Sequence, residues 1–164
     1  MNRAAQRQKF VDIMARFTVY TGKYLPDDVY AKLKELREKE DTALATIVYD
    51  AMFEDLRWAH ELNRPLCQDT GVIQYFVQVG TRFPLIDQME DCLVAAVKEA
   101  TILGPLRHNA VEVFDEKNTG NNVGKRIPWI EWEIVPDSDE ATIYVYMAGG
   151  GCSLPGIAKV LMPL

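Results

Sequence analysis

The sequence contains few cysteines and histidines, the residues that stabilise small secreted domains through disulfides or bound metal ions. Three cysteines occur among 164 residues, and only two histidines accompany them. A disulfide framework needs paired cysteines and a closed zinc site needs four ligands, so neither class of domain is expected. A zinc module would have to gather Cys67, Cys152, His60 and His108 from distant segments. The cysteine usage indicates a reducing compartment, and we expect the protein to be cytoplasmic.

Long apolar runs and an excess of positive charge are also missing. No stretch approaches the ~20 apolar residues that a membrane-spanning helix needs. The opening MNRAAQRQKF is not followed by the apolar core of a secretory signal, so none is predicted. Asp and Glu outnumber Lys and Arg by 24 to 18, for a formal net charge of −6. Because an acidic chain does not attract a phosphate backbone, a nucleic acid is not an expected partner, and the lack of a long apolar run makes a membrane equally unexpected.

What the sequence does contain is enough apolar material for a core, at 48% of its residues. The first third of the chain has the periodicity of helices, with a helix start at Pro26 and a helix end near Asn63, ahead of Pro65. Three apolar stripes at helical spacing are expected to pack into the core: Phe10, Ile13, Met14 and Phe17; Val29, Leu33 and Leu36; and Leu44, Val48, Met52, Leu56 and Ala59.

After Pro65 the pattern becomes that of a sheet with one helix in it. Alternation of apolar and polar residues predicts three strands, and PDSD between the last two is typical of a hairpin loop. The sequence therefore predicts an α+β fold: N-terminal helices, then a largely antiparallel sheet with one intervening helix. We expect a helical part over 1–63 and an α+β part over 64–164, with strands at 72–79, 129–135 and 141–147 and the helix at 86–100.

Three turn-like segments interrupt this rhythm and are the places where chemistry could occur. In RPLCQDTG (64–71), the thiolate of Cys67 could bind iron or act as a nucleophile, and Asp69 could move protons. An ordinary turn, with Asp69 bonded to its own backbone, explains the same residues. Cys92, within the expected helix, is better explained as core packing.

The other two segments are open to the same two interpretations. In LRHN (106–109), before an expected strand-like run from Asn109 to Phe114, Arg107 could grip a carboxylate through two parallel hydrogen bonds, or could simply be solvated. In GGGCSLP (149–155), three glycines suit either close backbone approach to a ligand or a tight turn. Cys152 is then a second reactive thiol or a small buried side chain. The irregular loop at 116–128 contains NTGNNVGK, whose spacing does not match a phosphate-binding loop.

Taken together, the three segments are similar to a known family. PLCQDTG, LRHNAVEVFDEKNTGNN and YMAGGGCSLPG, in this order and spacing, resemble the class I (iron–sulfur) fumarase and tartrate dehydratase family. The sequence AGGGCSLPG is more similar to the α subunits of the L(+)-tartrate dehydratase branch, since class I fumarases usually have GGGSEN at this position. The match runs from about Asp50 to the last residue.

The resemblance implies roles for particular residues. Cys67 matches the first of three thiolates that hold a [4Fe–4S] cluster. Gln68 and Asp69 match residues beside the substrate hydroxyl and carboxylates, with Asp69 a catalytic candidate. Arg107 matches a carboxylate-binding arginine, and Gly150 a backbone contact to substrate. The implied reaction is elimination of water from a 2-hydroxy dicarboxylate, L(+)-tartrate giving oxaloacetate, or alternatively malate giving fumarate.

The same resemblance implies that the site is shared with other parts of the protein. Neither Cys92 nor Cys152 matches the other two cluster ligands, so residues 1–164 are expected to be the N-terminal domain of an α subunit. A C-terminal domain or a β subunit would supply those ligands and the base, in an oligomer. We expect this chain alone neither to hold the cluster nor to turn over. The alternative from another class is a non-catalytic domain of this fold that binds a dicarboxylate or another chain.

Overall fold

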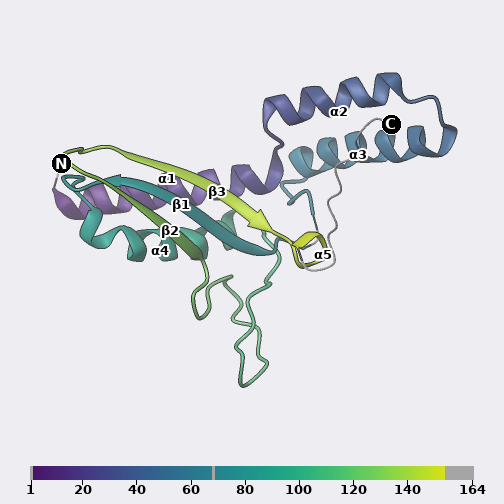
Figure 1. Cartoon of the computed structure of the whole chain (residues 1–164). Coiled ribbons are helices and arrows are strands. Elements are labelled where there is room, and N and C mark those ends of the chain that lie inside the picture. Colours follow the sequence, from purple (N-terminus) through teal and green to yellow (C-terminus); the bar gives the residue numbers. More distant parts are fainter. Residues whose placement is uncertain (1, 68, 154–164) are drawn as a thin grey trace, which may run out of the picture.

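A computed structural model describes residues 2–67 and 69–153 of the chain. It confirms the α+β class, with helices first and one long helix between the strands (Figure 1). The elements are α1 (Arg3–Lys23), α2 (Asp27–Lys39), α3 (Ala43–Glu61), β1 (Val72–Gly80), the short helix η1 (Ile86–Gln88), α4 (Met89–Leu103), β2 (Trp129–Val135), β3 (Ala141–Ala148) and the four-residue α5 (Gly150–Ser153).

The three described strands form one mixed sheet in the order β2-β1-β3. β1 runs parallel to β2 and antiparallel to β3. The hairpin expected between the last two strands is therefore wrong, because β2 and β3 lie on opposite sides of β1. The PDSD segment instead crosses the end of β1, where Arg82 N donates to Ser138 O at 2.9 Å. At Gly80, a Cβ would lie 2.2 Å from that oxygen, so glycine makes this crossing possible.

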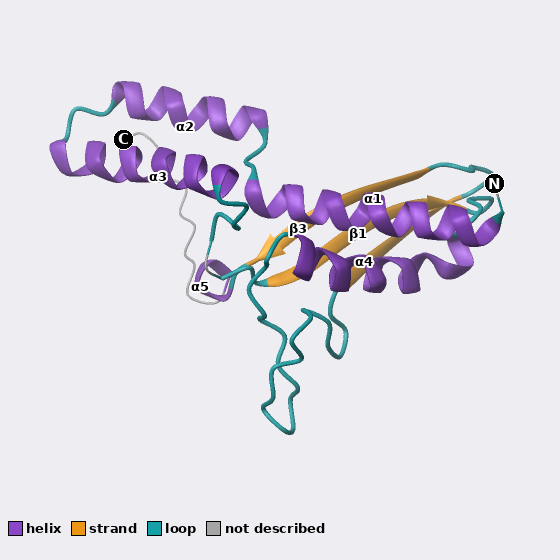
Figure 2. Ribbon diagram, turned by 180° about the vertical axis from the view of Figure 1, so that it is seen from behind, coloured by secondary structure: helices purple, strands orange, loops and turns teal. Residues whose placement is uncertain are grey.

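Figure 2 shows α1 and α4 covering one face of the sheet. The predicted apolar faces of β1 and β3 pack against the core, whereas in β2 only Ile130 does so and Trp132 and Ile134 are exposed. Cys92 of α4 lies in the core as expected. The outer face carries exposed aromatic side chains, among them Phe76, Tyr144 and Tyr146. The core comprises Val11, Met14, Ala15, Val19, Ile73, Tyr75, Val77, Val79, Met89, Cys92, Leu93, Ala96, Val97, Ala100 and Leu106.

The apolar stripe predicted for α1 is only partly correct. The side chains of Ile13 and Phe17 are 54% and 41% exposed, whereas the neighbouring stripe, with Ala15 and Thr18, is buried against α4 and the sheet. Small side chains let two helices approach closely, and Gly104 at the end of α4 contributes to this approach, since a Cβ there would lie 2.7 Å from Val19 Cγ2. Two members of the predicted stripe, Met14 and Phe10, do pack in or against the core.

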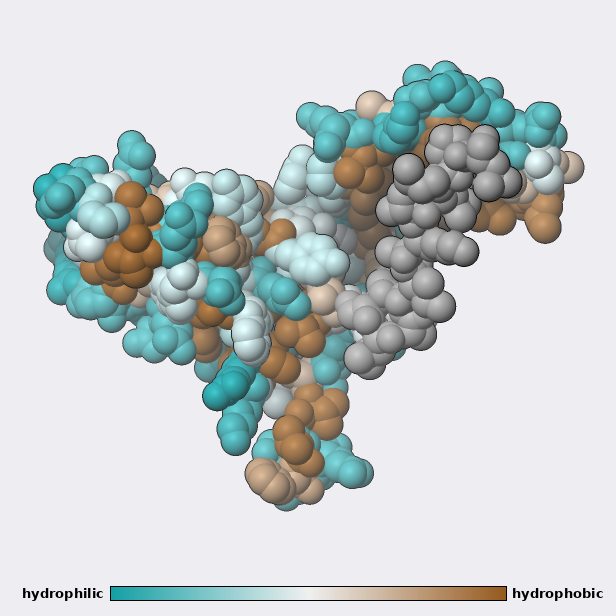
Figure 3. All heavy atoms as spheres, in the orientation of Figure 1, coloured by the Kyte–Doolittle hydropathy of each residue, from teal (hydrophilic) through white to brown (hydrophobic). Residues whose placement is uncertain are grey.

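The second and third helices form a hairpin that projects from the body of the molecule (Figure 1). The boundaries agree with prediction, since α2 follows Pro26 and α3 ends at Glu61. The expected burial is wrong: no residue of α2 and only Ala59 of α3 is buried within the described chain. Figure 3 shows hydrophobic atoms along this hairpin. No described helix has the combination of length and apolar character required for a membrane crossing.

Tyr75 of β1 leads to a prediction about stability at high pH. Its buried hydroxyl lies 2.7 Å from Thr18 Oγ1, and burial raises the pKa of Tyr75 from 10.0 to about 12. The pKa of Tyr75 is higher in the folded state than in the unfolded state, so the protonated phenol contributes fully to stability below pH 10. That contribution is lost as pH rises towards 12. We expect the free energy of unfolding to fall by about 1.4 kcal/mol per pH unit in that interval.

Urea unfolding at pH 9, 10 and 11 measures this slope. Tyr75→Phe should remove its contribution, and Tyr144→Phe, on the exposed face of the sheet, is the matched control. Equal slopes for wild type and Tyr75→Phe would show that the buried phenol does not cause the pH dependence.

Candidate functional site

The three segments singled out in the sequence meet at one carboxylate. Asp69 Oδ2 accepts a hydrogen bond from the N–H of Gly150 at 2.7 Å. Asp69 Oδ1 accepts one from Asn109 Nδ2 at 2.5 Å. Next to it, Thr70 Oγ1 accepts from the N–H of Arg107 at 3.0 Å. The half-buried Asp69 is thus bonded to Asn109, 40 positions later in the chain, and to Gly150, 81 positions later.

The segment that carries Cys67 is attached to the end of α1. Leu66 N donates to Gly22 O at 2.9 Å, and Lys23 Nζ donates to Asn63 Oδ1 at 2.8 Å. Asn63 has a φ of 52°, a left-handed conformation that asparagine tolerates and that turns the chain sharply after α3. These contacts hold the exposed Cys67 at the rim of a cavity of about 290 Å³ that Asp69, Thr70, Gly149 and Gly151 also line.

Glycine is required where the first and third segments approach each other. Gly71 has a φ of 73°, and a Cβ on it would lie 2.1 Å from Ala148 O. At Gly149 and Gly150 a Cβ would lie 3.5 Å from Asp69 Oδ2, which is ordinary contact. The three glycines at 149–151 were expected to serve either close approach to a ligand or a tight turn. The steric demand lies at Gly71 instead.

Asp69 also lines a second cavity, of about 560 Å³. Its lining includes three side chains that the sequence reasoning did not select for this site: Gln74, Asn109 and Trp129. Gln74 and Trp129 are direct partners on β1 and β2. Their position at the site depends on the parallel pairing of these strands, for which the sequence offered no signal. Asn109 could have been noticed, since it lies in the LRHN segment.

Arg107 and His108 follow the end of α4 and line a neighbouring cavity of about 560 Å³ with Asn118 and Gly120. His108 also lines the cavity beside Asp69, whereas Arg107 does not. The main chain of Arg107 is held at the site by the hydrogen bond to Thr70, and the Arg107 side chain is exposed. The strand-like run expected from Asn109 to Phe114 is wrong, since this stretch forms only an isolated bridge between Val111 and Asn118.

Some of the other predicted positions are described by the structure, and some are not. Gln68 lies outside the described residues, as do the side chain of Cys152 and the segment from residue 154 onward. Burial raises the pKa of the Cys92 thiol, which suits its place in the core. Of the two cysteines whose side chains are described, Cys67 is exposed and Cys92 is buried. No cluster of three or more His, Cys, Asp or Glu side chains suited to a metal ion occurs among the described residues.

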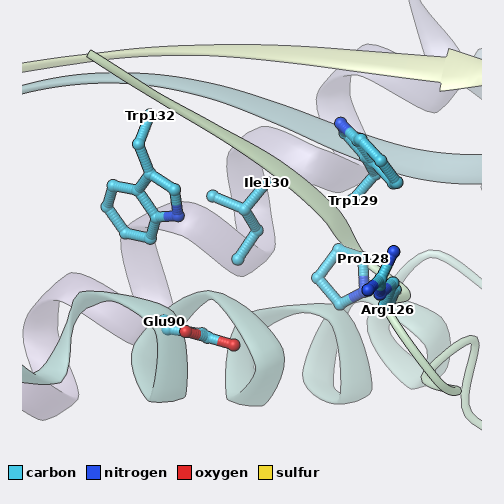
Figure 4. Close-up of a pocket in the computed structure, with 6 residues that line it drawn as sticks. All are labelled: Glu90, Arg126, Pro128, Trp129, Ile130 and Trp132. Carbon is cyan, nitrogen blue, oxygen red and sulfur yellow. The ribbon is translucent and has the colours of Figure 1, made fainter.

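A separate cavity of about 220 Å³ lies between β2 and α4 (Figure 4). Trp132, Ile130 and Pro128 line it from the strand side and Glu90 from the helix. Asp69, Cys67 and Gly150 do not line this cavity. The three segments singled out in the sequence meet around Asp69, and this region is the candidate site.

A family model described as fumarate hydratase (Fumerase) matches residues 11–164 of the chain. The chain belongs to this family. The resemblance inferred from the three segments is thereby confirmed, and it extends back through α3 and α2 to residue 11 within α1.

Curated relatives of this Fumerase-family chain carry a more specific name. It is 54% identical over 162 residues to the L(+)-tartrate dehydratase subunit alpha of Escherichia coli O157:H7, and 52% identical to that of strain K12. It is 32% identical over 158 residues to a putative L(+)-tartrate dehydratase subunit alpha of Methanocaldococcus jannaschii. These alignments cover 94–99% of the chain and 54–55% of the relatives, so the chain spans about half their length.

Proposed function

We propose that this chain forms part of a hydro-lyase that eliminates water from a 2-hydroxy dicarboxylate, with L(+)-tartrate as substrate and oxaloacetate as product. The observation that carries the proposal is the convergence of the Cys67–Asp69, Arg107–Asn109 and Gly149–Gly151 segments. The names of the curated relatives support the choice of tartrate.

The proposed reaction has a simple balance. The C–O bond of one hydroxyl breaks, and a proton leaves the neighbouring carbon. The two fragments depart together as water. The enol that results from tartrate becomes a 2-oxo dicarboxylate by moving one proton from oxygen to carbon. Nothing is oxidised or reduced overall, so the site needs only to bind two carboxylates, activate a hydroxyl and move protons.

Asp69 is suited to moving a proton at a fixed position. Its two oxygens each accept one hydrogen bond from the protein, and each carboxylate oxygen can accept a second. Asp69 also lines both the cavity with Cys67 and the cavity with His108. A substrate held between the two cavities would therefore place its hydroxyl within reach of this carboxylate.

Arg107 and Gly150 are proposed to hold the substrate carboxylates. The guanidinium of Arg107 is exposed, and its main chain is anchored to Thr70, next to Asp69. A bidentate pair with a carboxylate fixes orientation as well as charge. The N–H of Gly150 already donates to Asp69, so a substrate carboxylate at this N–H would compete with Asp69 for it. Gln68 completes the proposed binding set.

A [4Fe–4S] cluster is proposed for the assembled enzyme, with Cys67 as one of its three protein ligands. An exposed thiol at the rim of a cavity that Asp69 also lines fits such a ligand. Cys92 does not fit, because it is buried in the core. When bound, such a cluster supplies a Lewis acid for the leaving hydroxyl.

We infer that a second chain or a further domain completes this site. The word "subunit" in the relatives' names and their greater length support this. The proposal assigns to that β subunit or C-terminal domain the remaining thiolates and the base, within a cytoplasmic oligomer.

Assay of the complete gene product with its partner chain, prepared anaerobically, tests this function. We expect kcat/KM for L(+)-tartrate to exceed that for L-malate by at least about tenfold, because a site built to hydrogen-bond a second hydroxyl disfavours a substrate that lacks it. A preference for malate would assign the protein to fumarate chemistry. Tight dicarboxylate binding without turnover would favour the non-catalytic alternative.

A further inference from the structure

Asn122 is a buried polar residue outside the proposed catalytic set. It lies in the long loop between α4 and β2, is 2% exposed and has a φ of 56°. Its side chain makes two hydrogen bonds: Oδ1 accepts from the N–H of Asn109 at 2.7 Å, and Nδ2 donates to Thr101 Oγ1 at 3.2 Å.

These bonds connect the site to a rigid helix. Thr101 belongs to α4, is buried, and donates from Oγ1 to Val97 O at 2.8 Å, with Asn121 O also within reach at 3.1 Å. Asn109 in turn donates from its side chain to Asp69 Oδ1. A continuous chain of contacts therefore runs from α4 through Thr101, Asn122 and Asn109 to the carboxylate.

The burial of this amide requires an explanation beyond the turn itself. A left-handed φ is met at lowest cost by glycine, which would place no polar group in the interior. A buried primary amide destabilises the fold unless its donor and acceptor are both satisfied. Asn122 satisfies both, and its acceptor serves the backbone of the residue that holds Asp69. The side chain thus fixes the segment that carries Arg107, His108 and Asn109.

We propose that Asn122 is a positioning residue for Asp69, acting through Asn109. This inference rests on the proposed function for its consequence in catalysis, but not for the contacts themselves. Loss of the Asn122 side chain would leave the Asn109 N–H without its acceptor and would loosen the segment relative to α4. Asp69 would keep its bond from Gly150 and lose a fixed partner on its other oxygen.

The first test measures the contact without any assay of activity. Hydrogen–deuterium exchange of the Asn109 amide should be about 10- to 100-fold faster in Asn122→Gly than in wild type, since the amide loses its acceptor. Glycine keeps the left-handed backbone unstrained. Asn122→Asp retains an oxygen acceptor and should restore slow exchange. The matched control is Asp137→Gly, another left-handed residue (φ 55°) in the exposed turn after β2.

The second test uses the assembled enzyme. Asn122→Gly should lower kcat about 10- to 100-fold while KM for tartrate stays within about threefold, because misplacement of a catalytic group lowers the rate more than it weakens binding. Asn122→Asp should recover most of the loss, and Asp137→Gly should match wild type. Iron content should be equal in all four proteins.

The outcomes separate the two proposals. If wild type has no dehydratase activity but Asn122→Gly accelerates exchange at Asn109, the function is wrong and the network is correct. Wild-type exchange at Asn109 in Asn122→Gly would overturn the inference, whatever the activity. So would unchanged kcat in an active enzyme, or equal loss of kcat and iron, which indicates a general structural defect.

Discussion

Replacing Asp69 by asparagine is expected to lower kcat for dehydration about 10³-fold in the assembled enzyme. General acid–base groups contribute about 10²- to 10⁴-fold, and the amide cannot take up or release the proton. The amide oxygen can replace only one of the two carboxylate acceptors that Gly150 N–H and Asn109 Nδ2 now use. We therefore also expect a loss of about 1–2 kcal/mol in the free energy of unfolding.

Steady-state kinetics and urea unfolding of the same preparation separate these two effects. Asp55→Asn, a change of the same chemistry on the exposed surface of α3, is the matched control and should leave both quantities as in wild type. Asp69→Glu keeps the carboxylate but lengthens the side chain, and should fall between wild type and Asp69→Asn. Activity of Asp69→Asn within tenfold of wild type would remove Asp69 from the proton-transfer step.

Replacing Cys67 by serine is expected to reduce both bound iron and turnover to background in the assembled enzyme. A thiolate is the ligand that iron–sulfur clusters require, and Cys92, the other cysteine whose side chain is described, is buried in the core. Because Cys67 is exposed at a cavity rim, the fold should tolerate the change, with the midpoint of unfolding close to that of wild type.

Iron analysis and visible absorption after anaerobic reconstitution measure this effect. Cys92→Ala is the matched control: it removes a buried thiol from α4, should cost about 1 kcal/mol of stability, and should leave iron and activity unchanged. Full iron content in Cys67→Ser would show that the cluster, if present, has a different ligand. The 164-residue chain alone should not retain the cluster through desalting, and retained absorption would contradict the shared site.

The elements of this fold follow local rules that can be applied to the sequence. Alternation along 72–79, 129–135 and 141–147 predicted each strand, and in β1 and β3 the apolar face that it predicted packs against the core. Pro26 and Pro65 marked the helix boundaries, because proline restricts the backbone locally.

The pairing of the strands and the burial of the helices do not follow from local rules. The PDSD segment is compatible with a hairpin and also with the observed crossing over the end of β1. In α1, Ala15 and Thr18 are buried where the bulkier Ile13 and Phe17 are exposed, since close packing on α4 selects small side chains.

Residues of the candidate site that have distinctive chemistry could be predicted from the sequence. Residues that reach the site only through the fold could not. Cys67, Asp69 and Gly150 come from segments with unusual composition, and the structure brings these segments together. Gln74 and Trp129 reach the site through strand register, which the sequence does not display. Asn122 reaches it through a single backbone contact to Asn109.

The most direct measurement of the central claim is a crystal structure of the complete, anaerobically prepared enzyme with a bound dicarboxylate. We predict iron bound to Cys67 Sγ. We predict one substrate carboxylate paired with Arg107, and the hydroxyl within hydrogen-bond distance, about 2.5–3.0 Å, of Asp69. A dicarboxylate bound elsewhere, with Asp69 and Cys67 contacting neither substrate nor metal, would contradict the account.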